Sequence, residues 1–248
     1  MRLKKNIIYL CNTEKSASGG AKIIYHHSEL INNLNDFSSQ VIHIKKKKTA
    51  KWKTSFNKKF KISKGIETGW QLNEIEATKK FKYEWFRNKI SIKENLSFDK
   101  KKDFVILPEI FAHLASDLLI KNKIKYAIFV QNGYSINFTN NLKKLELAYS
   151  KAEFILSYSS DISECIKLNF PKLKTEIIKI KYSIASNSIK KKVRKKNLIT
   201  YMSRKLPVHS NHVVLLLKKY LPKNWNIKDL NNIDEKLVYR NLQESKVF

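Results

Sequence analysis

The sequence predicts an α/β fold: a doubly wound parallel sheet with helices on both faces, followed by a partial second domain of the same kind. Short apolar segments alternate with segments of helical periodicity along most of the chain, and this alternation is typical of parallel sheets. A glycine pair separates the first apolar segment from the first helical one. A lysine-rich break then divides the alternation into a long part and a short part.

The first elements are a strand, a helix and a second strand. Residues 7–11 are apolar and partly β-branched, which favours a short buried strand. From Ala21 onwards, apolar side chains recur every three or four residues, which predicts an amphipathic helix. Residues 41–44 predict the next strand. Elements in this order form a parallel pair of strands with a right-handed crossover.

The next segment is less regular. Residues 45–60 are basic, with aromatic side chains at four-residue spacing, which favours a short amphipathic helix. In the stretch that follows, we expect one or two strands near residues 66–70 and 83–86.

A regular alternation then resumes and completes the first domain. We expect strands at residues 104–107, 126–130, 154–157 and 176–180, and helices at residues 111–120, 141–151 and 161–168. This run extends the sheet into a doubly wound, Rossmann-like arrangement. We therefore assign residues 1–188 to an N-terminal Rossmann-like domain.

A charged stretch at residues 189–197 predicts the interdomain linker. After it we expect strands at residues 198–202 and 225–227, helices at residues 213–220 and 234–242, and the start of another strand at residues 247–248. Residues 198–248 hold too few elements to close a core of ordinary size. We therefore expect an incomplete second Rossmann-like domain, which either lacks its remainder or docks on something else.

The charge of the chain keeps alternative functions open. The formal net charge is +29, which favours a polyanionic partner such as nucleic acid or an anionic membrane. Lys, Ile and Asn are abundant together, however, and all three have A/T-rich codons. Codon bias is therefore an alternative source of the positive charge. Residues 45–60, with their interleaved aromatic side chains, suit either a nucleic-acid-binding or a membrane-surface protein without catalysis. Since no nucleic-acid-binding fold signature is present, we expect no specific nucleic-acid partner.

Targeting and metal-binding signals are weak. The apolar run at residues 7–11 is shorter than the roughly 7–15 residues of a secretory signal, and no stretch approaches the ~20 residues of a membrane span. Cys11, Cys165 and six His residues form no metal-binding pattern, so we expect no metal and no cofactor. We predict a cytoplasmic protein, with residues 45–60 a candidate for peripheral contact with the inner face of the membrane.

Two polar motifs follow predicted strands, where α/β folds bind their ligands. Gly19 and Gly20 open the first helix, so a phosphate can approach the backbone and the helix N-terminus. A tight turn would use the same glycines. Their spacing matches neither the dinucleotide fingerprint nor the P-loop. Gln131 and Asn132 follow the strand at residues 126–130 and can bond hydroxyls or a base edge, although an Asn-Gly turn is the alternative.

These motifs resemble the group-1 (retaining, family 4) GT-B glycosyltransferases. The glycine pair resembles the loop before that family's first long helix, and residues 39–44 (SQVIHI) resemble the strand after it. The dipeptide ending in Glu109 and the pair Gln131-Asn132 resemble the "P-E" and "F-x-Q-N" elements of a rhamnosyltransferase-like subset. Residues 152–160 resemble the family segment in which a strand ends in serine residues before a helix. Residues 199–205 resemble the first strand of the family's second domain, and residues 241–248 resemble the lead-in to its donor-binding stretch.

The resemblance implies transfer of a sugar, with retention, from a nucleotide-sugar donor to a cell-envelope glycan or lipid-linked acceptor. It implies phosphate contacts from Gly19, Gly20, Arg204 and Lys205, and acceptor or cleft roles for Glu109, Gln131 and Asn132. An Arg can clamp the charge that develops on a diphosphate leaving group, although the family more often separates its Arg and Lys by several residues. The family's sugar-binding carboxylates would lie beyond Phe248, so we assign no catalytic residue and expect the chain alone to be inactive or weakly active.

Overall fold

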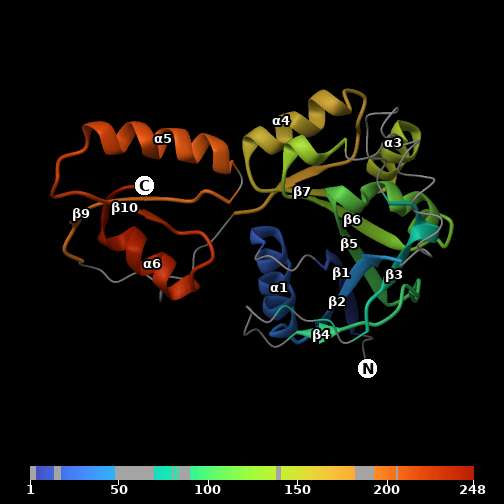
Figure 1. The fold of residues 1–248 in the computed structure, drawn as a ribbon. Coiled ribbons are helices and arrows are strands. Elements are labelled where there is room, and N and C mark those ends of the chain that lie inside the picture. The colour runs from blue at the N-terminus through green and yellow to red at the C-terminus, as the bar shows by residue number, and fades with distance from the viewer. Residues whose placement is uncertain are drawn as a thin grey trace, which may run out of the picture. The chain divides into compact units, whose positions relative to one another are not determined.

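The computed structural model describes residues 4–13, 18–47, 70–79, 81, 83, 90–137, 141–181, 193–204 and 206–248. Contacts divide the chain into two compact units, Met1–Lys181 and Tyr182–Phe248 (Figure 1). The boundary predicted after residue 188 and the first part of the predicted linker lie outside the described residues. Residues 193–195 have no regular structure, and the first strand of the second unit begins at Lys196.

The first unit is built on an eight-stranded sheet with the order β3-β2-β1-β5-β6-β7-β8, in which β4 also pairs with β2. Its strands are β1 (Lys5–Asn12), β2 (Phe37–Lys46), β3 (Ile75–Ala77), β4 (Ser91–Ile92), β5 (Asp103–Pro108), β6 (Lys125–Val130), β7 (Ile155–Ser157) and β8 (Ile177–Lys179). Among these described strands, the pairings are parallel except between β2 and β3. The predicted class, an α/β fold with a mostly parallel sheet, is confirmed.

The order of the strands reverses between β1 and β5. β1 pairs with β2 on one side and with β5 on the other, so the chain builds the sheet outwards in two directions from this point. In open α/β sheets, such a reversal leaves a crevice at the carboxyl ends of the two central strands, because the connections leave them in opposite directions. This geometry marks the ends of β1 and β5 as the place to look for a site.

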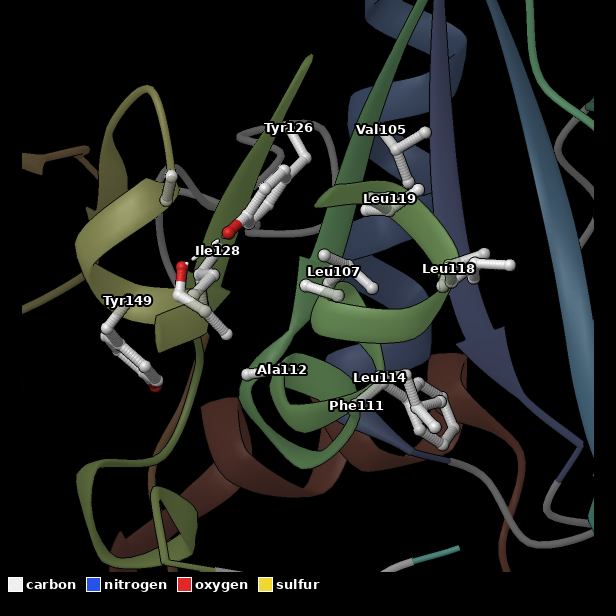
Figure 2. Close-up of a cluster of buried hydrophobic side chains, with 14 of the residues drawn as sticks. Val105, Leu107, Phe111, Ala112, Leu114, Leu118, Leu119, Tyr126, Ile128 and Tyr149 are labelled. Carbon is white, nitrogen blue, oxygen red and sulfur yellow. Dashed lines mark hydrogen bonds between the residues drawn. The ribbon is translucent and has the colours of Figure 1, made fainter. Parts of the chain in front are cut away.

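Helical segments cover both faces of this sheet. The helices among the described residues of this unit are α1 (Gly19–Asn32), α3 (Leu142–Lys151) and α4 (Ser160–Asn169), with short 3-10 turns at Leu72–Glu74, Glu109–Leu114 and Gly133–Ser135. Alternate residues of β1 belong to two separate apolar clusters: Tyr9 and Cys11 pack with α1, whereas Ile8 and Leu10 belong to the cluster that contains α3 and α4 residues. Figure 2 shows part of the cluster that contains α3 and α4 residues, with Leu107 of β5 and Ile128 of β6 facing the turns after β5.

The α-helix predicted at residues 111–120 is wrong in detail. The chain forms the 3-10 turn Glu109–Leu114 and then a π-helical turn, Ser116–Ile120. Phe111, Leu114 and Ser116 are all buried, as are the residues between them. An amphipathic α-helix keeps one face in water, whereas this segment packs almost all of its side chains inside the protein and changes its winding to do so.

The less regular segment also differs from the prediction. Lys45 and Lys46 extend β2, while residues 48–60 of the predicted basic helix lie outside the described residues. Trp70 and Tyr83 belong to no strand, and the other residues of the two strands predicted there lie outside the described part of the chain. The strands β3 and β4, which pair with the outer edge of β2, are too short to leave an apolar pattern in the sequence.

The second unit is a small parallel sheet with the order β10-β9-β11. Its elements are β9 (Lys196–Tyr201), α5 (Pro207–Tyr220), β10 (Asn226–Asp229), α6 (Glu235–Glu244) and β11 (Ser245–Val247). The α5 helix begins six residues before the predicted helix, with Pro207 at its first turn, where a proline's missing N–H costs nothing. Across the described residues of both units, no helix is long and apolar enough to cross a membrane.

Candidate functional site at the strand reversal

Three of the predicted site residues meet beside the strand reversal. Gly20 lies in the first turn of α1, Glu109 follows β5, and Gln131 follows β6. The Gln131 side chain donates from Nε2 to the Gly20 carbonyl oxygen at 3.2 Å. The Gln131 backbone N–H donates to Glu109 Oε2 at 3.0 Å. Gln131 thereby joins Gly20, which lies 111 positions before it, to Glu109, which lies 22 positions before it.

Gly20 is required by the closeness of this contact. A Cβ built on Gly20 would overlap Gln131 Oε1, whereas a Cβ on Gly19 would meet nothing within 4 Å. A larger residue at position 20 must therefore displace the Gln131 side chain. The two glycines thus differ: Gly20 allows another segment to approach the backbone closely, and Gly19 has no such neighbour among the described residues.

Glu109 supports the turn after β6. It is only 5% exposed. Burial raises the pKa of Glu109, while hydrogen bonds from the backbone amides of Gln131, of Glu109 itself and of Asn132 oppose that rise. An acceptor in this position satisfies backbone donors that would otherwise be buried without a partner. Its observed contacts therefore fix the position of Gln131.

Gln131 keeps hydrogen-bonding capacity for a ligand. Its Nε2 carries two hydrogens, and one of them is donated to Gly20. Within the described part of the chain, no hydrogen bond is accepted by its Oε1. With respect to the described residues, one donor and one acceptor therefore remain at the end of β6, on a side chain that is held at both its backbone and its amide.

The N-terminus of α1 suits an anion. Its N-cap residue, Ser18, has extended backbone and makes no side-chain cap hydrogen bond, and the first turn contains no acidic residue. The half-buried Lys22 adds a positive charge to that turn, and burial lowers its pKa. Backbone N–H groups at such a terminus, together with the helix dipole, attract phosphate or carboxylate groups.

Asn132 is engaged locally. Its Oδ1 accepts from the Tyr134 backbone N–H at 3.1 Å, and its Nδ2 donates to Ser135 Oγ at 3.0 Å. These bonds cap the 3-10 turn Gly133–Ser135. The structure therefore gives Asn132 the turn-forming role, which was the alternative to ligand contact in the sequence.

The other predicted phosphate ligands lie in the second unit. Arg204 is exposed in the turn after β9, and Lys205 lies outside the described residues. Asp229, the last residue of β10, accepts hydrogen bonds from the Ser203 hydroxyl and, at 3.3 Å, from the Ser203 backbone N–H. Although burial opposes it, these bonds and those from the amides of Asn231 and Leu230 hold the pKa of Asp229 below its ordinary value. The carboxyl ends of β9 and β10 are thus tied together next to Arg204.

A buried histidine was not singled out from the sequence. His43, in β2, is fully buried, and its ring lies against Tyr25, Phe81 and Tyr83. Its Nδ1 lies 3.1 Å from the carbonyl oxygen of Asn12, the last residue of β1. The alternation of side chains along a strand could have indicated its burial. His43 lies on the same side of β2 as Val41, which packs in the apolar cluster with α1. In the described ranges, no three metal-ligating side chains gather.

The comparisons with known proteins add no family. The sequence matches no protein-family model, and a search of curated proteins finds no match.

Proposed function

We propose that this chain is of the GT-B glycosyltransferase type, a class that takes a sugar from a nucleotide-sugar donor to a cell-envelope glycan or lipid-linked acceptor, and that it binds a nucleotide of such a donor. The observation that carries the proposal is the meeting of Gly20, Glu109 and Gln131 beside the strand reversal. The order of motifs along the chain adds the chemical class, since it resembles that family from residue 19 to residue 248.

The position of the site supports ligand binding independently of the resemblance. Ligands of open α/β sheets lie outside the carboxyl ends of the strands where the strand order reverses. Here these ends belong to β1 and β5, and Gly20, Glu109 and Gln131 are the residues that follow β1, β5 and β6.

The chemistry of the site supports a phosphorylated sugar. The first turn of α1, without a capping side chain or an acid and with Lys22, offers N–H donors and positive charge to phosphate oxygens. Gln131 offers one donor and one acceptor, the pair that a sugar hydroxyl can use. Phosphate at the helix end and hydroxyls at the glutamine would together hold a nucleotide sugar or a phosphorylated acceptor.

The second unit, taken by itself, carries a candidate phosphate ligand, Arg204. During transfer, the bond between the anomeric carbon and the phosphate oxygen breaks, and its electron pair stays on the diphosphate. The acceptor hydroxyl forms the new bond to that carbon, and its proton passes to the released diphosphate. We assign Arg204 to the diphosphate, because a guanidinium can bind two of its oxygens as negative charge develops. The Ser203–Asp229 contact holds the turn on which Arg204 lies.

A binding experiment tests the proposal. The full chain is titrated calorimetrically, at physiological ionic strength, with uridine, guanosine, adenosine and deoxythymidine diphosphates and their glucose conjugates. We expect saturable binding of at least one of them, weakened by Arg204→Ala and unchanged by Arg194→Ala. Arg194 is exposed and precedes β9, so its variant removes the same charge. No binding of any nucleotide, or equal losses in both variants, would contradict the proposal.

A further inference from the structure

A closed hydrogen-bond network joins β2, α1 and the carboxyl end of β1. His43 Nε2 lies 2.8 Å from Tyr25 Oη, and His43 Nδ1 lies 3.1 Å from the Asn12 carbonyl oxygen. The Tyr83 backbone N–H donates to Tyr25 Oη at 3.3 Å. Tyr83 Oη shares its one proton between two acceptors on Asn12, the carbonyl oxygen at 2.8 Å and Oδ1 at 2.9 Å. The bonds donated by His43 Nδ1 and by Tyr83 Oη thus both end on Asn12.

The direction of these bonds is fixed by elementary chemistry. A carbonyl oxygen can only accept, so His43 Nδ1 donates to Asn12. A neutral imidazole then accepts at Nε2, and Tyr25 Oη must be the donor there. Burial lowers the pKa of His43 to about 4, so the ring is neutral near neutral pH and the direction holds. The two hydrogen bonds at its ring nitrogens therefore fix the position of His43 between Tyr25 and Asn12.

The register places Asn12 at the strand reversal. β1 and β5 pair from Asn6 with Asp103 to Tyr9 with Ile106. The same offset, continued to the ends of both strands, sets Asn12 level with Glu109. On its other side, Asn12 pairs with Ile44 of β2. Asn12 therefore ends the central strand beside the residue that positions Gln131.

The side chain of Asn12 has a donor group without a partner among the described residues. Its Oδ1 accepts from Tyr83, and its Nδ2 donates to no other residue in the described part of the chain. The residue is half-buried. The hydrogen bond from Tyr83 to Oδ1 fixes the orientation of the amide and therefore the direction of its NH₂ group. A fixed donor loses less conformational entropy when a ligand binds.

We infer that Asn12 is a ligand-binding residue of the strand-reversal site, and that His43 and Tyr83 position its side-chain NH₂ to donate to a ligand oxygen. The chemical class of that oxygen, a sugar hydroxyl or a phosphate oxygen, rests on the proposed function. The binding role of Asn12 and the positioning role of His43 do not follow from the family resemblance, in which Asn12 has no part and His43 is only one residue of a strand segment.

The test follows the side-chain amide of Asn12 by nuclear magnetic resonance in the full chain, assigned with Asn12→Asp. Inorganic phosphate is titrated in one arm, and methyl glycosides of glucose, galactose, mannose and rhamnose in the other. We expect the Asn12 NH₂ signals to shift saturably in one arm, which identifies the source of the oxygen. If they shift in neither arm, the inference is wrong, whatever the nucleotide titrations show. If they shift although no nucleotide binds, the inference stands and the proposed function fails.

A second variant separates positioning from folding. Tyr83→Phe removes only the hydroxyl that holds Asn12, and we expect about three- to ten-fold weaker binding of the responding probe, the range of one hydrogen bond. Tyr126→Phe is the matched control, because Tyr126 Oη also donates a buried hydrogen bond, to the Ala148 carbonyl oxygen at 2.6 Å, away from the site. Equal affinities for the two variants would overturn the positioning role of the Tyr83 hydroxyl.

Discussion

Gln131 extends from the end of β6 to the first turn of α1, where its side-chain amide donates to the Gly20 carbonyl oxygen at 3.2 Å. This contact couples two strand ends that are not neighbours in the sheet, since β1 and β6 are separated by β5. Any ligand at the strand reversal would meet the helix N-terminus and the glutamine as one surface. Changes at Gly20 should therefore affect Gln131, and changes at Glu109 should do the same.

The glycine pair gives the first prediction. Gly20→Ala should displace the Gln131 side chain, so its free energy of unfolding should lie below that of Gly19→Ala by about 0.5–1.5 kcal/mol, the typical contribution of a lost hydrogen bond. Gly19→Ala is the matched control, because its Cβ meets nothing within 4 Å. It should raise stability by roughly 0.4–1 kcal/mol through the unfolded state. Urea unfolding of both variants measures the difference, and identical effects would contradict the assigned contact.

Glu109 gives the second prediction. Glu109→Ala leaves the Gln131 backbone N–H without its acceptor, so we expect a loss of about 1–3 kcal/mol in the free energy of unfolding. Glu153→Ala removes an exposed carboxylate that pairs with Lys125 at 3.6 Å and should change stability by less than about 1 kcal/mol. A loss at Glu109 no greater than the loss at Glu153 would show that the buried carboxylate does not hold the turn.

The third prediction concerns pH. The pKa of His43 is lowered from 6.5 to about 4 by burial, although its bond to the Asn12 carbonyl opposes that shift. The unfolded chain therefore takes up this proton at higher pH than the folded protein, and stability should fall as pH is lowered from about 6.5 towards 4. Two and a half units correspond to about 3 kcal/mol.

Other groups contribute in the same pH range. Burial also lowers the pKa of His27 and His113, which adds to the loss of stability at low pH, whereas the raised pKa of Glu109 acts in the opposite direction. The test therefore compares the pH dependence of unfolding in the wild type with that of His43→Gln, which keeps a donor and an acceptor but cannot titrate. The variant should show the smaller slope; an unchanged slope would refute the assignment to His43.

The fourth prediction concerns the turn that carries Arg204. Asp229→Ala removes the acceptor for Ser203 and should weaken diphosphate binding without removing a residue assigned to the ligand. Asp234→Ala is the control, since Asp234 also accepts a backbone N–H, from Lys236 at 2.8 Å, at the start of α6. Calorimetric titration should show weaker binding for Asp229→Ala than for Asp234→Ala. Equal affinities would mean that the turn does not position Arg204.

Much of the fold could be predicted from the sequence because buried parallel strands are continuous apolar runs. Residues 104–107 and 126–130 correspond to β5 and β6 within one residue at either end. The segment after β5 was harder to predict from the sequence, because its burial on nearly all sides removes the helical periodicity on which prediction relies. β3 and β4 depend on pairing with the edge of β2, which no local pattern records.

The candidate site was only partly predictable for a related reason. Gly20, Glu109 and Gln131 follow strands, so their shared edge of the sheet could be inferred. The link through the Gln131 side chain depends on a distance between α1 and the end of β6 that the sequence does not contain. Asn12 gave no motif, because a single polar residue at the end of an apolar run looks like the start of a loop. His43 entered the pattern only as one residue of the strand segment 39–44.

The most direct test of the central claim locates the bound diphosphate. Backbone amide and side-chain signals of the full chain are mapped by nuclear magnetic resonance during titration with the nucleoside diphosphate that binds best in calorimetry. We predict that the largest shifts fall on Gly19, Gly20, Ala21 and the Gln131 side chain, and that Gln131→Ala reduces them. Shifts confined to residues outside the carboxyl ends of β1, β5 and β6, or no shifts at all, would contradict a ligand site at the strand reversal.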